Sequence, residues 1–281
     1  MSNTLFVGKV YYRFDELPST NDWAAQIVAQ SSKPLLPLEG AGGRTAKTKP
    51  PEGTVVRAAN QTAGRGQHGS PWHSSPGDNL LLSIILYPSW LEAQAQFYLS
   101  MAVALALKDL AQSLEISHQP TVKWPNDLYL GNRKTAGILI QNSISGSRLQ
   151  SSIVGIGLNV NQLEFPEDLP HATSLAQVLG KKLNLDALEE QVFECVERRY
   201  LQLKAGNRRG IKAEYEENLW QRGTAACFVR LADGLEFEGV ILGVTEQGML
   251  RVETGKDVEE FDLKQVGLVQ NKTGAIPNQS K

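Results

Sequence analysis

The stretch KWPNDLYLGNRKTAGILIQ, residues 123–141, combines the pattern of a β-hairpin with side chains that a hairpin does not require. Two short β-forming runs are followed by a Gly-Asn turn at 131–132, and a strand then continues to the end of the stretch. The Pro-Asn-Asp that follows Trp124 is ordinary turn chemistry, but a turn needs neither Trp124 nor Lys123. Gly137 lies inside the second strand, which indicates that another group approaches the backbone there. We therefore expect a hairpin that carries a cationic and aromatic site.

Three other segments are also rich in glycine or polar residues: STN at 19–21, QTAGRGQHG at 61–69 and GIGLNVN at 155–161. Each of them, taken alone, is also compatible with an ordinary loop, cap or turn. The glycines of 61–69 allow close approach of a ligand, and Arg65 adds a cation with forked donors for phosphate or carboxylate. This loop is neither a Walker A motif nor a dinucleotide-binding turn, because no Gly-Lys-Ser/Thr and no helix follow it. Together the segments favour binding of a nucleotide and an anion.

The rest of the first 222 residues alternates between strand and helix patterns. The run at 79–87 is nearly all apolar, which is typical of a central strand buried on both faces. Ser19 followed by Asp22 matches a capping box and predicts a helix start. The periodicity predicts further strands at 6–14, 54–58 and 151–160, and helices at 21–30, 91–114, 185–204 and 212–220.

The pattern of apolar and polar residues changes after residue 222. Residues 226–270 alternate between apolar and polar positions and contain short glycine turns, which predicts a four- or five-stranded small barrel. We therefore expect a catalytic domain at 1–222, a small C-terminal domain at 223–270 and a disordered tail at 271–281. The proline- and glycine-rich segment 31–53 predicts a mobile surface loop.

The composition excludes several classes of protein. Of the 281 residues 41% are hydrophobic and 21% charged, so the chain is an ordinary globular protein rather than a disordered one. The net charge of −2 shows no basic excess, which argues against a dedicated nucleic-acid binder. Cys195 and Cys227 are too few for a zinc cluster or a disulfide framework. Without a signal peptide or an apolar run of about 20 residues, the expected location is the cytoplasm and no membrane contact is expected.

In this order, the four segments resemble those of the biotin–protein ligase family, and the resemblance extends over nearly the whole chain, from about residue 10 to 269. It implies an α+β fold like that of class II aminoacyl-tRNA synthetases, with a mixed sheet, helices on one side and an SH3-like β-barrel after it. Members of the family join biotin to ATP with Mg²⁺, which gives biotinyl-5′-adenylate and pyrophosphate. They then transfer biotin to one lysine of a biotin carboxyl carrier domain, typically that of acetyl-CoA carboxylase.

The resemblance also assigns roles to residues of this chain. It places around biotin Ser19, Thr20, Asn21, Gln61, Arg65, Gly66, Gln67, Lys134 and Gly137. It places around ATP Trp72, Lys123, Asn126, Asp127 and Asn159, with Trp72 and Asn159 at the adenine and Asp127 near Mg²⁺. The three cations Arg65, Lys123 and Lys134 are the expected catalytic residues, because a carboxylate must attack a phosphate and both are anions. Asp127 is also a candidate base for the second step.

One departure from the family pattern lies in the glycine-rich loop. The common pattern is G-R-G-R-x-G, whereas this chain has G-R-G-Q-H-G, so Gln67 stands where a second arginine is usual. We expect Gln67 to hold the adenylate by hydrogen bonding without charge. Ser70 and Pro71, before Trp72, replace the basic residues of some members.

Several alternatives remain open at this stage. A lipoate–protein ligase shares the fold and the adenylate chemistry, an inactive biotin- or nucleotide-binding sensor shares the residues, and a purely structural module leaves the polar loops unexplained. Because the biotin motif begins at Ser19, we expect no helix-turn-helix domain, no DNA binding and no repressor activity. The resemblance leaves a homodimer open, since the family includes both monomers and homodimers.

Overall fold

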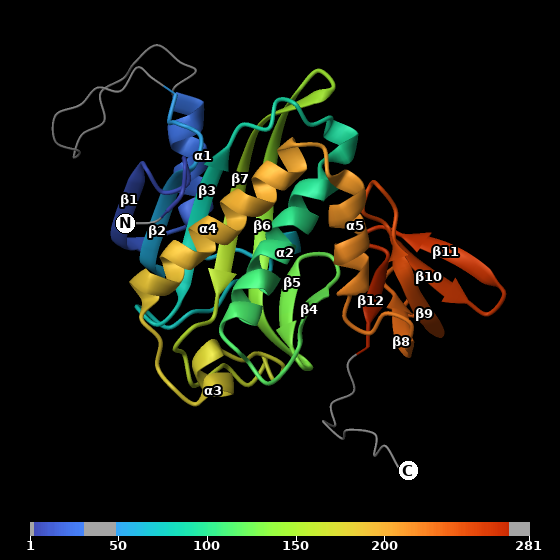
Figure 1. Cartoon of the computed structure of the whole chain (residues 1–281). Coiled ribbons are helices and arrows are strands. Elements are labelled where there is room, and N and C mark those ends of the chain that lie inside the picture. Colours follow the sequence, from blue (N-terminus) through green and yellow to red (C-terminus); the bar gives the residue numbers. More distant parts are fainter. Residues whose placement is uncertain (1–2, 31–48, 270–281) are drawn as a thin grey trace.

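A computed structural model describes residues 3–30 and 49–269 (Figure 1). The predicted tail at 271–281 and most of the predicted loop at 31–53 lie outside the described residues. The elements of the first part are β1 (Tyr11–Leu17), α1 (Thr20–Gln30), β2 (Thr54–Gln61), β3 (Leu80–Leu86), α2 (Phe97–Ser113), β4 (Pro120–Lys123), β5 (Asp127–Leu130), β6 (Arg133–Ser145), β7 (Arg148–Leu158), α3 (Leu175–Leu179), α4 (Leu185–Lys204) and α5 (Arg208–Glu217). They are followed by β8 (Ala225–Arg230), β9 (Glu236–Val244), β10 (Leu250–Thr254), β11 (Asp257–Phe261) and β12 (Val266–Leu268).

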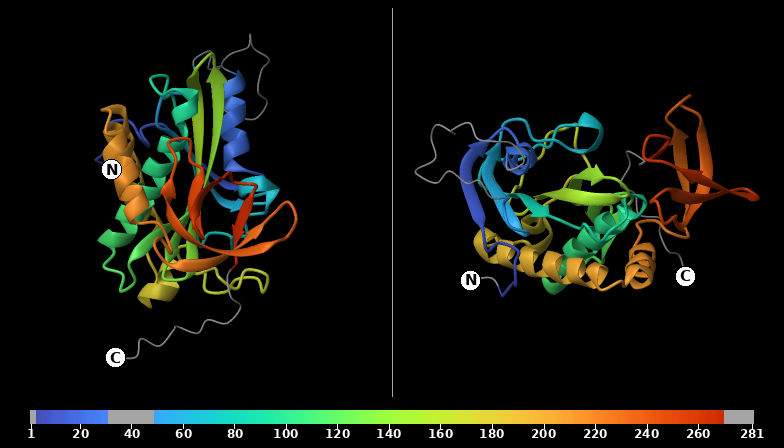
Figure 2. Two further views of the ribbon diagram at one scale, coloured as in Figure 1. Left: turned by 90° about the vertical axis from the view of Figure 1, so that its right-hand side faces the viewer. Right: turned by 90° about the horizontal axis from the view of Figure 1, so that it is seen from above.

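The first sheet is the mixed sheet that the family resemblance implies. Its seven strands follow the order β1-β2-β3-β7-β6-β5-β4, with β1 and β2 parallel and all other neighbours antiparallel. Figure 2 shows α2 and α4 together on one side of these strands and α1 on the other. The expectation of helices on one side thus holds for α2 and α4 but not for α1.

The two faces of β3 belong to different cores. Leu82 and Ile84 pack with α2 and α4, whereas Ile85 packs with Ala24 of α1. All seven residues of β3 are buried, which confirms the prediction of a central strand covered on both faces. Burial of one such leucine or isoleucine contributes about 1.5–3 kcal/mol to stability. The strand is therefore a rigid base for the side chains of β2, β7 and α1, which pack beside it.

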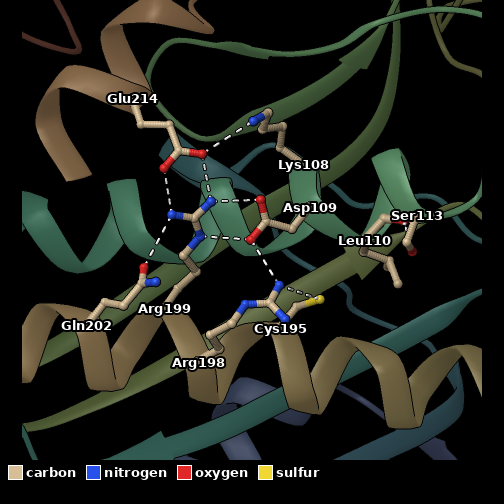
Figure 3. A network of polar contacts seen from close by, with 9 residues as sticks. All are labelled: Lys108, Asp109, Leu110, Ser113, Cys195, Arg198, Arg199, Gln202 and Glu214. Atoms are coloured by element: carbon tan, nitrogen blue, oxygen red, sulfur yellow. Dashed lines mark hydrogen bonds and ion pairs between the residues drawn. The ribbon is translucent and has the colours of Figure 1, made fainter. Parts of the chain in front are cut away.

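A network of ion pairs joins α2, α4 and α5 (Figure 3). Arg199 of α4 lies 2.7 Å from Asp109 of α2 and 2.6 Å from Glu214 of α5, and Lys108 pairs with Glu214 at 3.3 Å. Burial raises the pKa of Asp109, but hydrogen bonds from the neighbouring arginines outweigh burial and hold this pKa below its usual value. The network fixes α5, whose Tyr215 hydroxyl donates a hydrogen bond to the backbone carbonyl of Pro125 at 2.9 Å. The helices thereby support the start of the 123–141 hairpin.

The C-terminal sheet differs from the predicted barrel. Its five antiparallel strands follow the order β11-β10-β9-β8-β12, and in the described part of the chain β11 does not pair with β12. The three residues of β12 pair with β8 alone. A barrel requires each strand to pair on both sides, so this sheet is open rather than closed. The predicted domain boundary at 222/223 falls between the two sheets and stays a prediction.

Several element predictions need correction. The helix expected at 91–114 begins only at Phe97, after a short 3-10 turn at Ala93–Ala95, and the helix expected at 212–220 spans Arg208–Glu217. The strand expected at 6–14 begins only at Tyr11, because the backbone N–H groups of residues 5–7 donate to the carboxylate of Glu197 at 2.6–2.9 Å and not to a neighbouring strand. The short helix α3, which Ser174 caps, has no counterpart among the predicted elements. Among the described residues, no helix is long and apolar enough to span a membrane.

Candidate active site

A cavity of about 440 Å³ opens where the start of α1, the glycine-rich loop, the 123–141 hairpin and the C-terminal sheet meet. The predicted site residues that line it are Ser19, Thr20, Asn21, Gln61, Arg65, Gly66, Gln67, Trp72, Lys123, Asn126, Asp127, Lys134 and Gly137. Asn159 is the predicted site residue that does not line it. Segments more than 100 residues apart in the sequence thus converge on one cavity, and the two ends of the cavity differ in chemistry.

The neutral end is formed by Ser19, Thr20, Asn21 and Gln61. The backbone N–H of Thr20 donates to Gln61 Oε1 at 2.7 Å, and Asn21 Nδ2 donates to the carbonyl of Leu139 at 3.2 Å. The first three residues are 3–4% exposed, because α1 begins against the middle of the sheet. Ser19 Oγ accepts from the N–H of Asp22 at 3.3 Å, which confirms the first half of the predicted capping box. This end offers hydrogen bonds without net charge.

The cationic end is formed by Lys123, Lys134 and Asp127. Lys134 Nζ lies 2.8 Å from Asp127 Oδ1. Lys123 Nζ lies 3.2 Å from the hydroxyl of Tyr129, and it lies over the rings of Tyr129 and Trp220 at 5.3 and 5.5 Å. Burial lowers the pKa of Lys123, Asp127 opposes this, and Lys134 lowers this pKa further. Asp127 is thus the ion-pair partner of Lys134, whereas Lys123 contacts aromatic side chains.

The third cation comes from the glycine-rich loop. Arg65 forms an ion pair with Asp22 of α1, and both side chains are more than 40% exposed. Backbone hydrogen bonds from Gly66 to Ser70 and from Trp72 to Gly64 close the loop on itself. The loop therefore folds back against α1 and places Arg65, Gly66 and Gln67 at the rim of the cavity.

Trp72 lines the cavity, with its ring close to two glycines of the sheet and 5.5 Å from Lys134 Nζ. A Cβ atom added at Gly157 would lie 2.5 Å from the indole ring, and one added at Gly137 would lie 2.9 Å from it. Only glycine leaves room for the ring at these two positions. The resemblance assigned the space at Gly137 to biotin, whereas in this structure the ring of Trp72 approaches it. The Trp72 Nε1 is buried without a hydrogen-bond partner in the described residues.

Asn126 and Asn159 are both buried and hydrogen-bonded within the protein. Asn126 Nδ2 donates to the carbonyl of Ile138, which ties the turn to β6. Asn159 Nδ2 donates to the carbonyl of Thr173 at 3.1 Å, and its Oδ1 is buried without a partner in the part of the chain that the structure describes. Asn159 contacts the loop behind Lys134 rather than the cavity, so its assignment to adenine stays a prediction.

Other residues of the cavity carry no signal in the sequence. Trp220 precedes the C-terminal sheet, and Phe228, Ile241, Leu250 and Leu268 belong to it. The indole N–H of Trp124 donates to the carbonyl of Gly248 at 2.8 Å and so joins the hairpin to the turn between β9 and β10. Apolar residues at strand spacing predict core positions. Some of these residues line the cavity because the C-terminal sheet packs next to it, which the spacing does not indicate.

The described residues contain no group of three or more His, Cys, Asp or Glu side chains placed to hold a metal ion. Asp127 is the single carboxylate among the described residues that line the cavity. Mg²⁺ in nucleotide sites is bound by one or two carboxylates together with substrate phosphates and water. The donor set fits a magnesium ion that arrives with a nucleotide rather than a metal held by the protein alone.

Comparisons with known proteins agree with this geometry. Residues 42–159 match the model of the "Biotin/lipoate A/B protein ligase family". The "Bifunctional ligase/repressor BirA" of Bacillus subtilis is 36% identical over 220 residues, which is 77% of this chain, and the chain spans only 66% of that relative's length. The "Biotin--[acetyl-CoA-carboxylase] ligase" of Mycobacterium tuberculosis is 30% identical over 73% of this chain and 74% of its own length.

Solved structures show the same fold. The biotin protein ligase of Aquifex aeolicus in complex with biotin and ATP superposes with a TM-score of 0.71 at 24% identity, covering 93% of this chain and 99% of that one. The ligase of Leishmania major in complex with biotinyl-5-AMP superposes with a TM-score of 0.55 at 20% identity, covering 90% of this chain and 99% of that one. The chain therefore belongs to the biotin/lipoate A/B protein ligase family and, within it, to the biotin–protein ligases.

Proposed function

We propose that this protein is an ATP-dependent ligase that activates biotin to biotinyl-5′-adenylate and transfers biotin to one lysine of a biotin carboxyl carrier domain. The observation that carries the proposal is the division of one cavity into a neutral hydrogen-bonding end and a cationic end. Biotin has a neutral cyclic urea at one end and a carboxylate at the other. Relatives named as biotin–[acetyl-CoA-carboxylase] ligases support a carrier domain of that enzyme as the partner.

In the first step the biotin carboxylate attacks the α-phosphorus of ATP, and pyrophosphate leaves. Both reactants are anions, so their approach is repulsive without cations. Lys134, Lys123 and Arg65 would hold the two groups in line and stabilise the charge that develops on the phosphate. A magnesium ion bound to the ATP phosphates, near Asp127, would neutralise further charge. The carboxylate is already ionised, so this step needs no general base.

In the second step the amine of the acceptor lysine attacks the acyl carbon of the adenylate. An amide forms, AMP leaves, and the amine loses a proton. We propose Asp127 as the acceptor of that proton, because it lines the cavity 2.8 Å from Lys134.

The test is ATP–pyrophosphate exchange with the purified protein, measured with biotin, with lipoate and without either acid. Exchange with biotin alone, followed by labelling of an added carrier domain, is the expected result. Lipoate has a dithiolane in place of the urea and cannot pair with the neutral end, so no exchange is expected with it. Exchange only with lipoate contradicts the proposal, and binding of biotin without exchange indicates a sensor.

A further inference from the structure

The central strand β3, with the sequence LLLSIIL, contains one polar side chain, Ser83. Its exposed fraction is 0%. The neighbours on either side, Leu82 and Ile84, point to the core with α2 and α4, so Ser83 points to the opposite face, where α1 begins. A hydroxyl that is buried without a hydrogen bond is costly, so its partners indicate why it stands there.

Both partners of Ser83 belong to the neutral end. Ser83 Oγ lies 2.6 Å from Asn21 Oδ1 and 2.8 Å from Thr20 Oγ1. The Ser83 hydroxyl has one proton to donate. Asn21 Oδ1 is an acceptor and cannot donate, whereas Thr20 Oγ1 can donate as well as accept. Ser83 is thus matched to the oxygen of the Asn21 carboxamide, while the amide nitrogen donates to the carbonyl of Leu139. These two contacts set which way round the carboxamide lies.

The sheet register places a third feature beside them. Ser83 of β3 pairs with Gly155 of β7, and Gly155 pairs with Leu139 of β6, so the three residues form one row across the sheet. A Cβ atom added at Gly155 would lie 2.5 Å from Asn21 Oδ1. The row therefore supplies a hydroxyl, a gap and a carbonyl, and each of the three fits the same carboxamide.

From this row we infer that Ser83 is a positioning residue that sets the specificity of the neutral end for a head group with a urea. The inference rests on the proposed function, which makes biotin the ligand. A cyclic urea offers one carbonyl and two N–H groups, and it needs donors and acceptors in fixed places. Side chains that are already oriented lose less conformational freedom when the ligand binds. A head group without a urea would leave them unpaired, and buried unpaired groups oppose binding.

Ser83→Ala tests the inference, with Ser152→Ala as the matched control. Ser152 is equally buried in the same sheet, and its hydroxyl lies 2.7 Å from Asn142 Oδ1, outside the cavity. In biotin-dependent ATP–pyrophosphate exchange we expect Ser83→Ala to raise the KM for biotin about tenfold or more. Its kcat and its KM for ATP should stay within about twofold of wild type, and Ser152→Ala should change none of the three.

Direct binding separates this inference from the proposed function. The Kd values of biotin and desthiobiotin, measured by calorimetry without ATP, should rise by the same factor in Ser83→Ala, because both ligands carry the urea. If the wild-type protein binds biotin but shows no exchange, the proposed function fails and the role of Ser83 is still read from Kd. If biotin affinity and KM in Ser83→Ala equal those of wild type, the inference is overturned.

Two further variants cover the case that Ser83→Ala does not fold. Ser83→Cys keeps nearly the same size but provides only a weak donor, so it should also weaken biotin binding severalfold. Gly155→Ala should displace the carboxamide of Asn21 and raise the KM for biotin without changing the KM for ATP. Wild-type biotin affinity in either folded variant, or an equal rise of both KM values, contradicts the role of Ser83.

Discussion

The two ends of the cavity are held by different means. At the neutral end, Thr20 and Asn21 are fixed by Gln61, Leu139 and Ser83, which belong to β2, β6 and β3, so the side chains already have partners from a rigid sheet. At the cationic end the lysines lie on the hairpin, and the partners of the cations are single carboxylates or aromatic rings.

The difference indicates that one end of the cavity serves substrate affinity and the other serves the chemical step. The neutral end is preorganised, so changes there should affect the affinity for one substrate and leave the chemical step unchanged. In the proposed reaction the cations would exchange their present partners for the anions of the substrates, and their interactions would become strongest when charge develops on the phosphate. Changes at the cationic end should therefore lower the rate more than the affinity.

The largest effect is expected from Lys134→Met. Loss of this cation should lower kcat for biotin-dependent exchange by about 10²–10³-fold, as loss of one charge-stabilising group does in other enzymes. Arg133→Met is the control, because Arg133 is the neighbouring cation but is exposed and donates to the backbone of Ala172. A loss below tenfold for Lys134→Met, or equal losses for both variants, would contradict the distinction between the two ends.

Trp72→Ala should have the next largest effect. The family resemblance places Trp72 at the adenine of ATP. Stacking of one base on an aromatic side chain contributes about 1–3 kcal/mol, so removal of the ring should raise the KM for ATP by about 10- to 100-fold. The KM for biotin should change less. Trp72→Phe keeps a ring above Gly137 and Gly157 and should recover most of the ATP affinity. Steady-state kinetics with each substrate varied in turn measures both effects, and a selective rise in the KM for biotin would show that the indole serves the neutral end.

The pH dependence of exchange tests Lys123. Burial lowers its pKa below the usual 10.5, with Asp127 opposing and Lys134 adding to the shift. A lysine with a lowered pKa loses its charge at a lower pH than an exposed lysine, so activity should fall on the alkaline side as pH rises through that value. Lys123→Arg keeps its charge at any such pH and should move the alkaline limb upward. A limb at the same pH in both proteins would assign it to another group.

The smallest effect is expected from Gln67→Arg. A second arginine in the glycine-rich loop adds a charge-assisted hydrogen bond at the rim of the cavity, so biotinyl-5′-adenylate should be released about tenfold more slowly at most. The release rate of adenylate formed on the enzyme measures this. An unchanged or faster rate would show that Gln67 holds the intermediate as well as an arginine does.

Local patterns in the sequence predict most of the elements and the residue types of the site. Alternation and periodicity placed β3, α4 and the hairpin, because these depend on neighbouring residues in the chain. The order of the motifs indicated the family, and the structure places the motif residues other than Asn159 around one cavity, while their roles stay predictions. Where local contacts were not decisive, as for residues 5–7, which bind Glu197 instead of extending β1, the prediction was wrong.

Which side chains meet inside the cavity depends on the three-dimensional packing of the chain. The strand order brings β3, β7 and β6 side by side although α2 and two strands separate β3 from β6 in the chain. That order puts Ser83 and Gly155 under Asn21, and it leaves the ring of Trp72 above Gly137 and Gly157. It also brings the C-terminal sheet against Trp124. Such contacts join residues that are remote in sequence, and their energies depend on packing and register, which no local pattern encodes.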